Sequence, residues 1–401
     1  MLKTKISAAL AAGSLILSTV SPAFAATTLE VSGNGSDSTS NVNFSQNRNV
    51  SVVQNNDAKI SNKVDIKSNT GDNNADDNTG GDVKIDTGDS DVDIKVSNML
   101  NKNAASVDCC ETGDVEVKVS GNGTESDNKV GLELGGKKEI FQDNKANVKN
   151  DVEVDQTTGE NEADDNTGGD VEITTGKAWT GVKLLTAANA NSAKIGGGDS
   201  GQGGTLSAWI TGNGSDSDNS LDLDLGGDTS IVQENDAYVK NDVDVDQETG
   251  DNEAEDNTGG EVMIDTGDAD ALVMVDNLVN FNVADVDCGC ELDATAKIAG
   301  NGTDSENDIT ATLGGDLSLF QGEDSKAHLD NDVEADSDTG DNDADDNTGA
   351  YDESSDPSIA TGDTDSTTDI TNAGNVNVFG QGDLDLELDF DWDSLLDFLG
   401  L

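Results

Sequence analysis

The sequence has very few basic residues. Its 401 residues include 21 Lys and Arg and a single His against 83 Asp and Glu, which gives a formal net charge of −62. Binding to nucleic acid requires a basic face that neutralises phosphates, so the phosphate backbone would repel this chain. The charge balance excludes DNA and RNA as partners and indicates that the surface attracts cations.

Aromatic residues and proline are also scarce. Aromatics make up 3% of the chain, and the only prolines are Pro22 and Pro357. So few large apolar residues permit only a thin core, and the composition approaches that of a disordered protein. Disordered acidic chains are usually rich in proline, however, whereas here 45 glycines supply turns without interrupting strand hydrogen bonds. Composition alone therefore leaves disorder or an unusual all-β fold.

No apolar run reaches the roughly 20 residues that span a bilayer. The longest, Ile6 to Val20, follows Lys3 and Lys5 and leads into Pro22-Ala23-Phe24-Ala25. A basic start, a short apolar stretch and small residues before Ala26 are typical of a cleaved secretory signal peptide, with an uncleaved anchor as the alternative. We expect a protein that is secreted or lies at the cell surface, with no membrane span after cleavage.

Two motifs recur at a fixed spacing. Gly-Asn-Gly-(Ser/Thr) begins at residues 33, 121, 212 and 300, which are 88, 91 and 88 residues apart, and Asp-Asn-Thr-Gly begins at residues 77, 165, 256 and 346. A longer period of 179 residues relates Cys109 to Cys288. The chain therefore contains four repeats of about 89 residues, which were duplicated as pairs.

Within each repeat the side chains alternate in character with a period of two. Gln54, Asn56, Ala58, Ile60 and Asn62 share one parity, and the residues between them are mostly charged or polar. This alternation predicts strands, and the amides on the apolar face need partners if that face is buried. Amide ladders between strands stacked in register would supply those partners.

A repetitive β-solenoid or stacked-strand rod provides this stacking and needs only a narrow core. The alternatives are four tandem β-sandwich domains, since about 89 residues also suits an immunoglobulin-like module, and a largely disordered chain. The expected organisation is a signal peptide at 1–25, repeats at 26–118, 119–195, 205–297 and 298–379, a Gly-rich joint at 196–204, and an acidic-apolar tail at 380–401. The fourth repeat is the most degraded and is a candidate cap.

The repeats carry a resemblance to known families. Gln-x-Asn-x-Ala at Gln54 to Ala58, followed by Gly-x-Asn-x-Ala at Gly71 to Ala75, resembles the strand motifs of curlin-type amyloid subunits. Over most of residues 30–379, the Gly/Asn/Asp-rich repeats resemble those of large secreted bacterial surface proteins of the adhesin or matrix type. The resemblance implies an extracellular structural or adhesive role.

Each repeat also carries an acidic loop that begins five residues before its Asp-Asn-Thr-Gly motif. In an extended segment, alternate carboxylates such as those of Asp341, Asp343 and Asp345 would lie on one side and repel one another. A bound Ca²⁺ would relieve that repulsion, because it takes six to eight oxygen ligands; the alternative is a solvated acidic turn. The candidate ligands are Asp72, Asp76, Asp77, Glu160, Asp164, Asp165, Asp251, Glu255, Asp256, Asp341, Asp343 and Asp345.

Four cysteines occur in two clusters, Cys109-Cys110 and Cys288-Gly289-Cys290. An even number of cysteines in an exported protein favours disulfides. Adjacent cysteines pair with each other only under strain, so a link between the clusters or between two chains is geometrically easier. Metal binding and free thiols remain as further alternatives.

The C-terminal tail concentrates apolar residues that the repeats lack. Leu384, Leu386 and Leu388 alternate with acids as in a strand. The tail is either a strand that caps the solenoid or an exposed docking segment for a partner. Its candidate docking residues are Phe390, Trp392, Leu395, Leu396 and Leu399.

A catalytic role is not expected. The carboxylates repeat fourfold along the chain, as in a surface rather than a single site, and the lone His328 has outward parity between Ala327 and Leu329. We expect an exported structural repeat protein of the cell surface or extracellular matrix, an acidic rod screened by cations, with no organic cofactor. The alternatives are a Ca²⁺-dependent adhesin for carbohydrate or another surface, and an acidic mineral-binding protein. Self-association and surface glycans are the macromolecular contacts that these roles imply.

Overall fold

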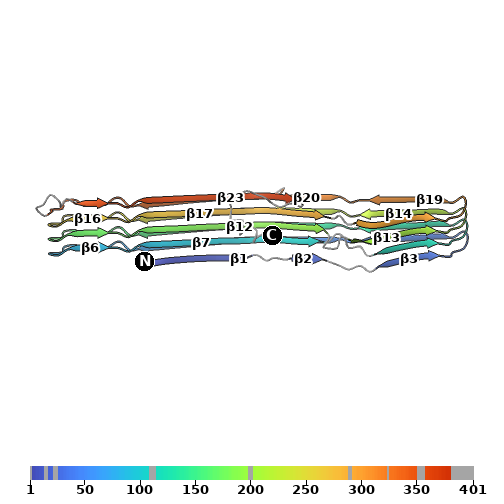
Figure 1. Ribbon diagram of the computed structural model, residues 1–401, viewed down its shortest axis with the longest axis horizontal. Coiled ribbons are helices and arrows are strands. Elements are labelled where there is room, and N and C mark those ends of the chain that lie inside the picture. The colour runs from blue at the N-terminus through green and yellow to red at the C-terminus, as the bar shows by residue number, and fades with distance from the viewer. Residues whose placement is uncertain are drawn as a thin grey trace.

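The computed structural model describes residues 2–12, 17–20, 26–107, 114–196, 202–287, 291–322, 325–349 and 357–380. Its elements are all β-strands, and equivalent strands of the four repeats stack in parallel. Figure 1 shows the repeats lying one above another along their full length. The all-β stacked-strand solenoid expected from the sequence is therefore confirmed, in preference to four separate sandwiches.

One repeat makes one rung, a flattened loop with two layers. In the first rung β3 (Thr27–Ser32) leads to a turn, and β4 (Thr39–Asn47) and β5 (Val50–Asn69) run back in the other layer. After the acidic turn, β6 (Val83–Asp86) and β7 (Ser90–Val107) return in the first layer. Each layer is thus built from strands of several repeats that lie side by side.

The other three rungs repeat this path. The second contains β8 (Val115–Ser120), β9 (Asp127–Gly135), β10 (Lys138–Thr157), β11 (Val171–Thr174) and β12 (Ala178–Gly196). The third contains β13 (Gln202–Thr211), β14 (Asp218–Gly226), β15 (Thr229–Glu248), β16 (Val262–Asp265) and β17 (Ala269–Asp287). The fourth contains β18 (Glu291–Ala299), β19 (Glu306–Leu313), β20 (Leu317–Gln321), β21 (Lys326–Asp338), β22 (Ser358–Ala360) and β23 (Thr364–Phe379).

Equivalent residues stand in columns that cross the rungs. Gln142 of β10 lies between Gln54 of β5 and Gln233 of β15, in the register that the repeat alignment predicts. In the fourth rung the extra residues after Gln321 split the long strand into β20 and β21, and both still pair with β15. The stacked columns are therefore kept throughout, even where the fourth repeat departs from the others.

The elongation of the molecule runs along the strands rather than along the stack. Residues 39–69 form one nearly continuous extended path of about 100 Å at 3.3 Å per residue, whereas successive rungs are only about 4.8 Å apart. Figure 1 shows this long, thin outline. A single chain is thus a flat four-rung strip whose long dimension is the strand direction, and a rod along the stacking axis would need more rungs than one chain supplies.

The N-terminal segment adds strands beside the first rung. The strands β1 (Leu2–Ala12) and β2 (Leu17–Val20) pair with β7 on the edge opposite β12. Leu2 lies opposite Ser90, which is the same register that Ala178 takes on the other edge of β7. Residues within the predicted signal peptide therefore occupy the place that a preceding rung would take beside β7.

The core lies between the two long sheets, where aliphatic and amide side chains alternate with outward polar ones. Val148 and Val152 of β10 are almost fully buried, and with their neighbours they pack against β12 and β7. Burial of alternate residues along β10 and β15 confirms the predicted parity of the amides and aliphatics. Since each rung contributes only small and medium side chains, the core is thin and continuous.

Buried asparagines form paired ladders through this core. Asn144 of β10 donates from Nδ2 to Oδ1 of Asn191 in the facing sheet at 2.8 Å and to Oδ1 of Asn235 in the next rung at 3.0 Å. Asn191 donates in turn to Asn235 and Asn282 at 2.9 and 3.0 Å. The ladders satisfy buried amides that would otherwise cost about 1–3 kcal/mol each.

A second asparagine column has an unusual backbone. Asn101, Asn189, Asn280 and Asn375 have φ between 58° and 64°, the left-handed region, within β7 and its equivalents. The Nδ2 atom of Asn189 donates to the carbonyl of Asp236 in the facing sheet at 2.7 Å. Asparagine tolerates this conformation, and the same bulge in each rung keeps the strands parallel without breaking the stack.

Glycine at the turns permits the close approach of rungs. A Cβ on Gly159 would lie 1.8 Å from the carbonyl oxygen of Gly250 in the next rung, whereas the equivalent Gly340 of the last rung meets only an Asp338 carboxylate oxygen at 3.3 Å. This turn column therefore requires glycine in the inner rungs but not in the last rung.

We predict that Gly159→Ala lowers the free energy of unfolding by about 2 kcal/mol or more, because two backbones must separate to admit the methyl group. The matched variant Gly340→Ala should change it by less than about 0.5 kcal/mol. Urea denaturation of dilute protein measures both values. Equal losses in the two variants would contradict the close rung contact.

We predict that Asn191→Ala costs about 2–4 kcal/mol, because it creates a cavity and removes the acceptor of two buried amides. Asn377→Ala, in the same column on the exposed fourth rung, should cost well under half as much. Thermal melting followed by circular dichroism compares them. A small loss for Asn191→Ala would mean that the ladders contribute little to stability.

Candidate functional site

The predicted calcium ligands lie on the turns that join the long strand of each rung to its short strand. Equivalent acids of successive rungs lie directly above one another, about 4.8 Å apart, and so form columns. The bridges Asn74–Glu162, Glu162–Glu253 and Glu253–Asp343 fix this register. The columns are Asp72–Glu160–Asp251–Asp341, Asp76–Asp164–Glu255–Asp345, and Asp77–Asp165–Asp256–Asp346.

The local backbone differs from the extended segment assumed for Asp341, Asp343 and Asp345. Asp341 and Asp346 have φ values of 53° and 50°, and their equivalents in the other rungs are also left-handed. The loop turns at Asp341 and Asp346, whereas Asp341, Asp343 and Asp345 are exposed and Asn342 and Ala344 between them are less so. The acids come together both along the stack and within one rung: after desolvation, Glu253 of the same rung raises the pKa of Glu255.

Several of these carboxylates bind the backbone of the next rung. Oδ1 of Asp76 accepts a hydrogen bond from the amide of Asp164 at 3.1 Å, and Oδ1 of Asp164 accepts one from the amide of Glu255 at 2.8 Å. Asp82 and Asp170 accept bonds from the following rung in the same way. The acids thus have a structural role, which is to satisfy amides where the turns lack regular strand pairing.

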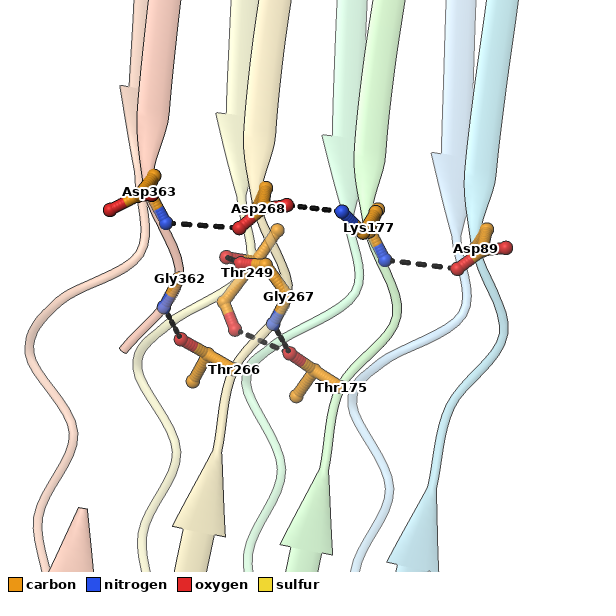
Figure 2. A network of polar contacts seen from close by, with 9 residues as sticks. All are labelled: Asp89, Thr175, Lys177, Thr249, Thr266, Gly267, Asp268, Gly362 and Asp363. Carbon is orange, nitrogen blue, oxygen red and sulfur yellow. Dashed lines mark hydrogen bonds and ion pairs between the residues drawn. The ribbon is translucent and has the colours of Figure 1, made fainter. Parts of the chain in front are cut away.

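The junction between the short and long strands of each rung repeats this arrangement (Figure 2). Oδ1 of Asp89 accepts the amide of Lys177 at 3.1 Å, and Oδ1 of Asp268 accepts the amide of Asp363 at 3.1 Å. The Lys177 ammonium also pairs with the Asp268 carboxylate. This contact, together with the Asp363 amide, lowers the pKa of Asp268, and it raises the pKa of Lys177.

Threonines form a second line of contacts in Figure 2. Thr175 Oγ1 accepts the amide of Gly267 at 3.1 Å and donates to the carbonyl of Thr249 at 3.1 Å. One rung further, Thr266 Oγ1 accepts the amide of Gly362 at 3.0 Å. Each rung is therefore tied to the next through side chains as well as through strands.

Stacked acids without a cation between them hold protons more tightly. The neighbouring Asp76 raises the pKa of Glu162. Partial burial, followed by the charges of Asp338 and Asp251, raises the pKa of Glu248 to about 7. Like charges one rung apart thus oppose the stacking that the backbone and amides favour.

No group of three or more His, Cys, Asp or Glu side chains is arranged to hold a metal ion among the described residues. Calcium binding by the twelve acids therefore stays a prediction. The cysteines Cys109, Cys110, Cys288 and Cys290 and the tail residues Phe390, Trp392, Leu395, Leu396 and Leu399 lie outside the described residues. His328 is exposed, as its parity predicts, and its ring stacks on that of Tyr238 with centroids 5.0 Å apart.

The fourth rung has an exposed apolar edge that the sequence reasoning missed. Leu313, Ile309, Ile359 and Ile370 are 70%, 46%, 45% and 40% exposed. Their equivalents one rung below, Leu225, Leu221, Ile264 and Val275, are at most 6% exposed. The signal was present in the repeat alignment, because an apolar column that ends at the last repeat must leave its final member uncovered.

The comparisons with known proteins add no relative. No protein-family model, curated protein or solved structure matches the chain. Within the part of the chain that the structure describes, no helix is long and apolar enough to cross a membrane. The rungs and their columns are therefore the features that bear on function.

We predict that the protein melts a few degrees higher at pH 5 than at pH 8. The folded pKa of Glu248 lies above its ordinary value of 4.5, so its contribution to stability is fully present below about pH 4.5 and is lost as the pH rises towards 7. Glu248→Gln should reduce the difference in melting temperature between pH 5 and pH 8. The control Glu116→Gln, whose stacked neighbours Thr28 and Ser207 carry no charge, should not. A melting temperature that rises with pH would contradict the like-charge columns.

Proposed function

We propose that this chain is an exported structural repeat protein of the cell surface or extracellular matrix, whose acidic faces are screened by cations and which carries out no catalysis. The observation that carries this proposal is the set of amide ladders that bind every rung to the next. Ladders of this kind hold a thin core rigidly along a path of about 100 Å, which suits a scaffold better than a pocket enzyme.

The distribution of the carboxylates supports a structural role. An acid–base site needs a few groups that converge and differ in pKa, whereas these acids recur in columns and many of them accept backbone amides of the next rung. Because the acids recur in every rung, they cover a surface rather than mark a single site. We therefore assign the acids to solubility, rung contacts and attraction of cations.

Export rests on the N-terminal 25 residues, whose basic start, apolar stretch and small residues before Ala26 fit a cleaved leader. The mature chain would then begin immediately before β3. The amide ladders do not depend on a reducing compartment. The cysteines of an exported chain would be in an oxidising environment.

One observation favours a second function, the binding of a cation-bearing mineral surface. The outward faces of β10, β15 and β21 form a regular grid of carboxylates, about 4.8 Å apart across the strands and about 6.6 Å apart along them. Its rows are Asp151–Asp242–Asp332, Glu153–Asp244–Glu334 and Asp155–Asp246–Asp336. A flat periodic array of this kind suits a crystal lattice better than a single sugar.

Cell fractionation and N-terminal sequencing test the proposal directly. We expect the protein in the medium or on the cell surface, with Ala26 as its first residue. An intracellular protein that retains Met1 would overturn it. Adsorption to a calcium mineral powder, compared with a glycan array in the presence and absence of Ca²⁺, separates the mineral-binding and adhesin alternatives from a purely structural role.

We predict that CaCl₂ and MgCl₂ at equal millimolar concentration raise the melting temperature by similar amounts, because both screen the acidic columns. NaCl at matched ionic strength should give a smaller rise in the same direction. Thermal melting by circular dichroism measures all three. A rise specific to Ca²⁺, abolished by chelator, would instead support the calcium sites and the adhesin role.

A further inference from the structure

The fourth rung ends the stack with open strand edges. Among the residues that the structure describes, the 13-residue β21 and the 16-residue β23 each pair with one neighbour only, β15 and β17 respectively. Long edges of this kind are templates for another strand unless charges, bulges or a covering segment block them. Four of the apolar side chains exposed on this rung, Ile309, Leu313, Ile359 and Ile370, lie in columns that are buried one rung below. A further rung stacked here would bury them.

The first rung offers the complementary edge. The strands β3, β4, β5 and β6 each have a partner on one side only, and these partners are β8, β9, β10 and β11. The same columns run through both ends: Asn62 is the first member and Asn331 the last of one asparagine ladder, whose steps of 2.8, 2.7 and 2.7 Å all run from Nδ2 to Oδ1 of the next rung. A ladder with one direction can continue only from the last rung of one copy to the first rung of another.

The charges at the two ends match in that arrangement. Continuing the columns from one copy to the next places Asp332 beside Lys63 and Asp336 beside Lys67, because each pair belongs to one column. Lys67 already pairs within the chain with Asp155 at 2.7 Å, and Lys63 lies 3.7 Å from Asp151.

Three further columns bring opposite charges together in the same way. They would pair Asp369 with Lys95, Lys326 with Asp57, and Lys297 with Glu30. In these five columns the first repeat supplies a lysine where the fourth supplies an acid, or the reverse. Other columns would add like charges, both in strands, with Glu334 above Asp65 and Asp365 above Asp91, and at turns, with Asp341 above Asp72, and salt screens them.

The leader occupies part of this interface. Its strand β1 pairs with β7 from Leu2 opposite Ser90 to Ala12 opposite Leu100, on the edge where β23 of another copy would lie. Loss of the leader opens that edge along the whole first rung.

We propose that exported copies of this chain stack head to tail, with rung four of one copy on rung one of the next in the register of the repeats, and that the leader blocks this contact until it is removed. The interface joins two different surfaces, rung four and rung one, so it is heterologous. Because it repeats the parallel step between rungs, each copy adds in the same direction, which generates an open filament whose strands run across its axis. The blocking step rests on the proposed export and cleavage, whereas the stacking itself does not.

Two edge glycines provide a test. A Cβ on Gly88 of the first rung meets nothing within 4 Å, although its equivalent Gly176 would meet the Gly88 carbonyl oxygen at 2.3 Å. At the other end, a Cβ on Gly340 meets only an Asp338 carboxylate oxygen at 3.3 Å, on a side chain that can move, although its equivalent Gly250 would meet the Gly340 carbonyl oxygen at 1.9 Å. Gly88→Ala and Gly340→Ala should therefore leave the single chain folded, and each should block one end of it.

The experiment uses the exported form that begins at Ala26, followed by sedimentation velocity and negative-stain electron microscopy. We expect filaments from the parent chain and from the control Ser318→Ala, an outward residue on the fourth rung. Each glycine variant alone should stay monomeric, with the circular dichroism spectrum of the parent. An equimolar mixture of the two should give a species of twice the monomer mass and nothing larger, because only one pair of ends remains competent.

Other results would overturn the proposal. A parent chain that stays monomeric at high concentration, with the β-spectrum retained, excludes the stacking, including the case in which the C-terminal tail covers rung four. Filaments from either glycine variant alone would show a different interface. The full chain from Met1 should stay monomeric, and filaments from it would refute the blocking role of the leader. If cells retain the leader but the form from Ala26 assembles, the proposed export fails and the stacking stands.

Discussion

Amide side chains stacked in register hold this structure together. Asn144, Asn191 and Asn235 each find partners in the facing sheet and in the neighbouring rung, so a core with few large apolar residues still has its polar groups satisfied. The ladder works only if like residues lie directly above one another, because an amide one position away would point to the opposite face. Register, repeat length and the parity of the strands all follow from this requirement.

Stacking like on like has a cost on the outer faces, where it also places acids above acids. The charge of Asp76 raises the pKa of Glu162, and burial followed by the charges of Asp338 and Asp251 raises that of Glu248. Lysines interleaved in some columns, as at Lys177 between Asp89 and Asp268, relieve it locally, and carboxylates at the turns are stabilised by the amides they accept. Dissolved cations would screen the remainder, as the proposed function assumes.

The same rule bears on assembly. A stack of nearly identical rungs has no intrinsic end, so the first and last rungs must be capped, charged or covered. Here the fourth rung retains apolar residues in the core columns, with Leu313 70% exposed, and its acids align with lysines of the first rung.

The sequence alone determined the repeats, the strand parity, the inward amides and the columns in which they stand, because a period of two within a period of about 89 residues leaves one register that buries every apolar position. The outward position of His328 followed from the same parity. Local pattern could not show that the backbone turns left-handed at Asp341 and Asp346, because aspartate is also compatible with an extended backbone. Nor could it show that each rung is about 100 Å long and the stack only four rungs deep, or which apolar residues stay exposed. Those features depend on which layer each strand joins and on where the stack ends, and only the tertiary structure decides both.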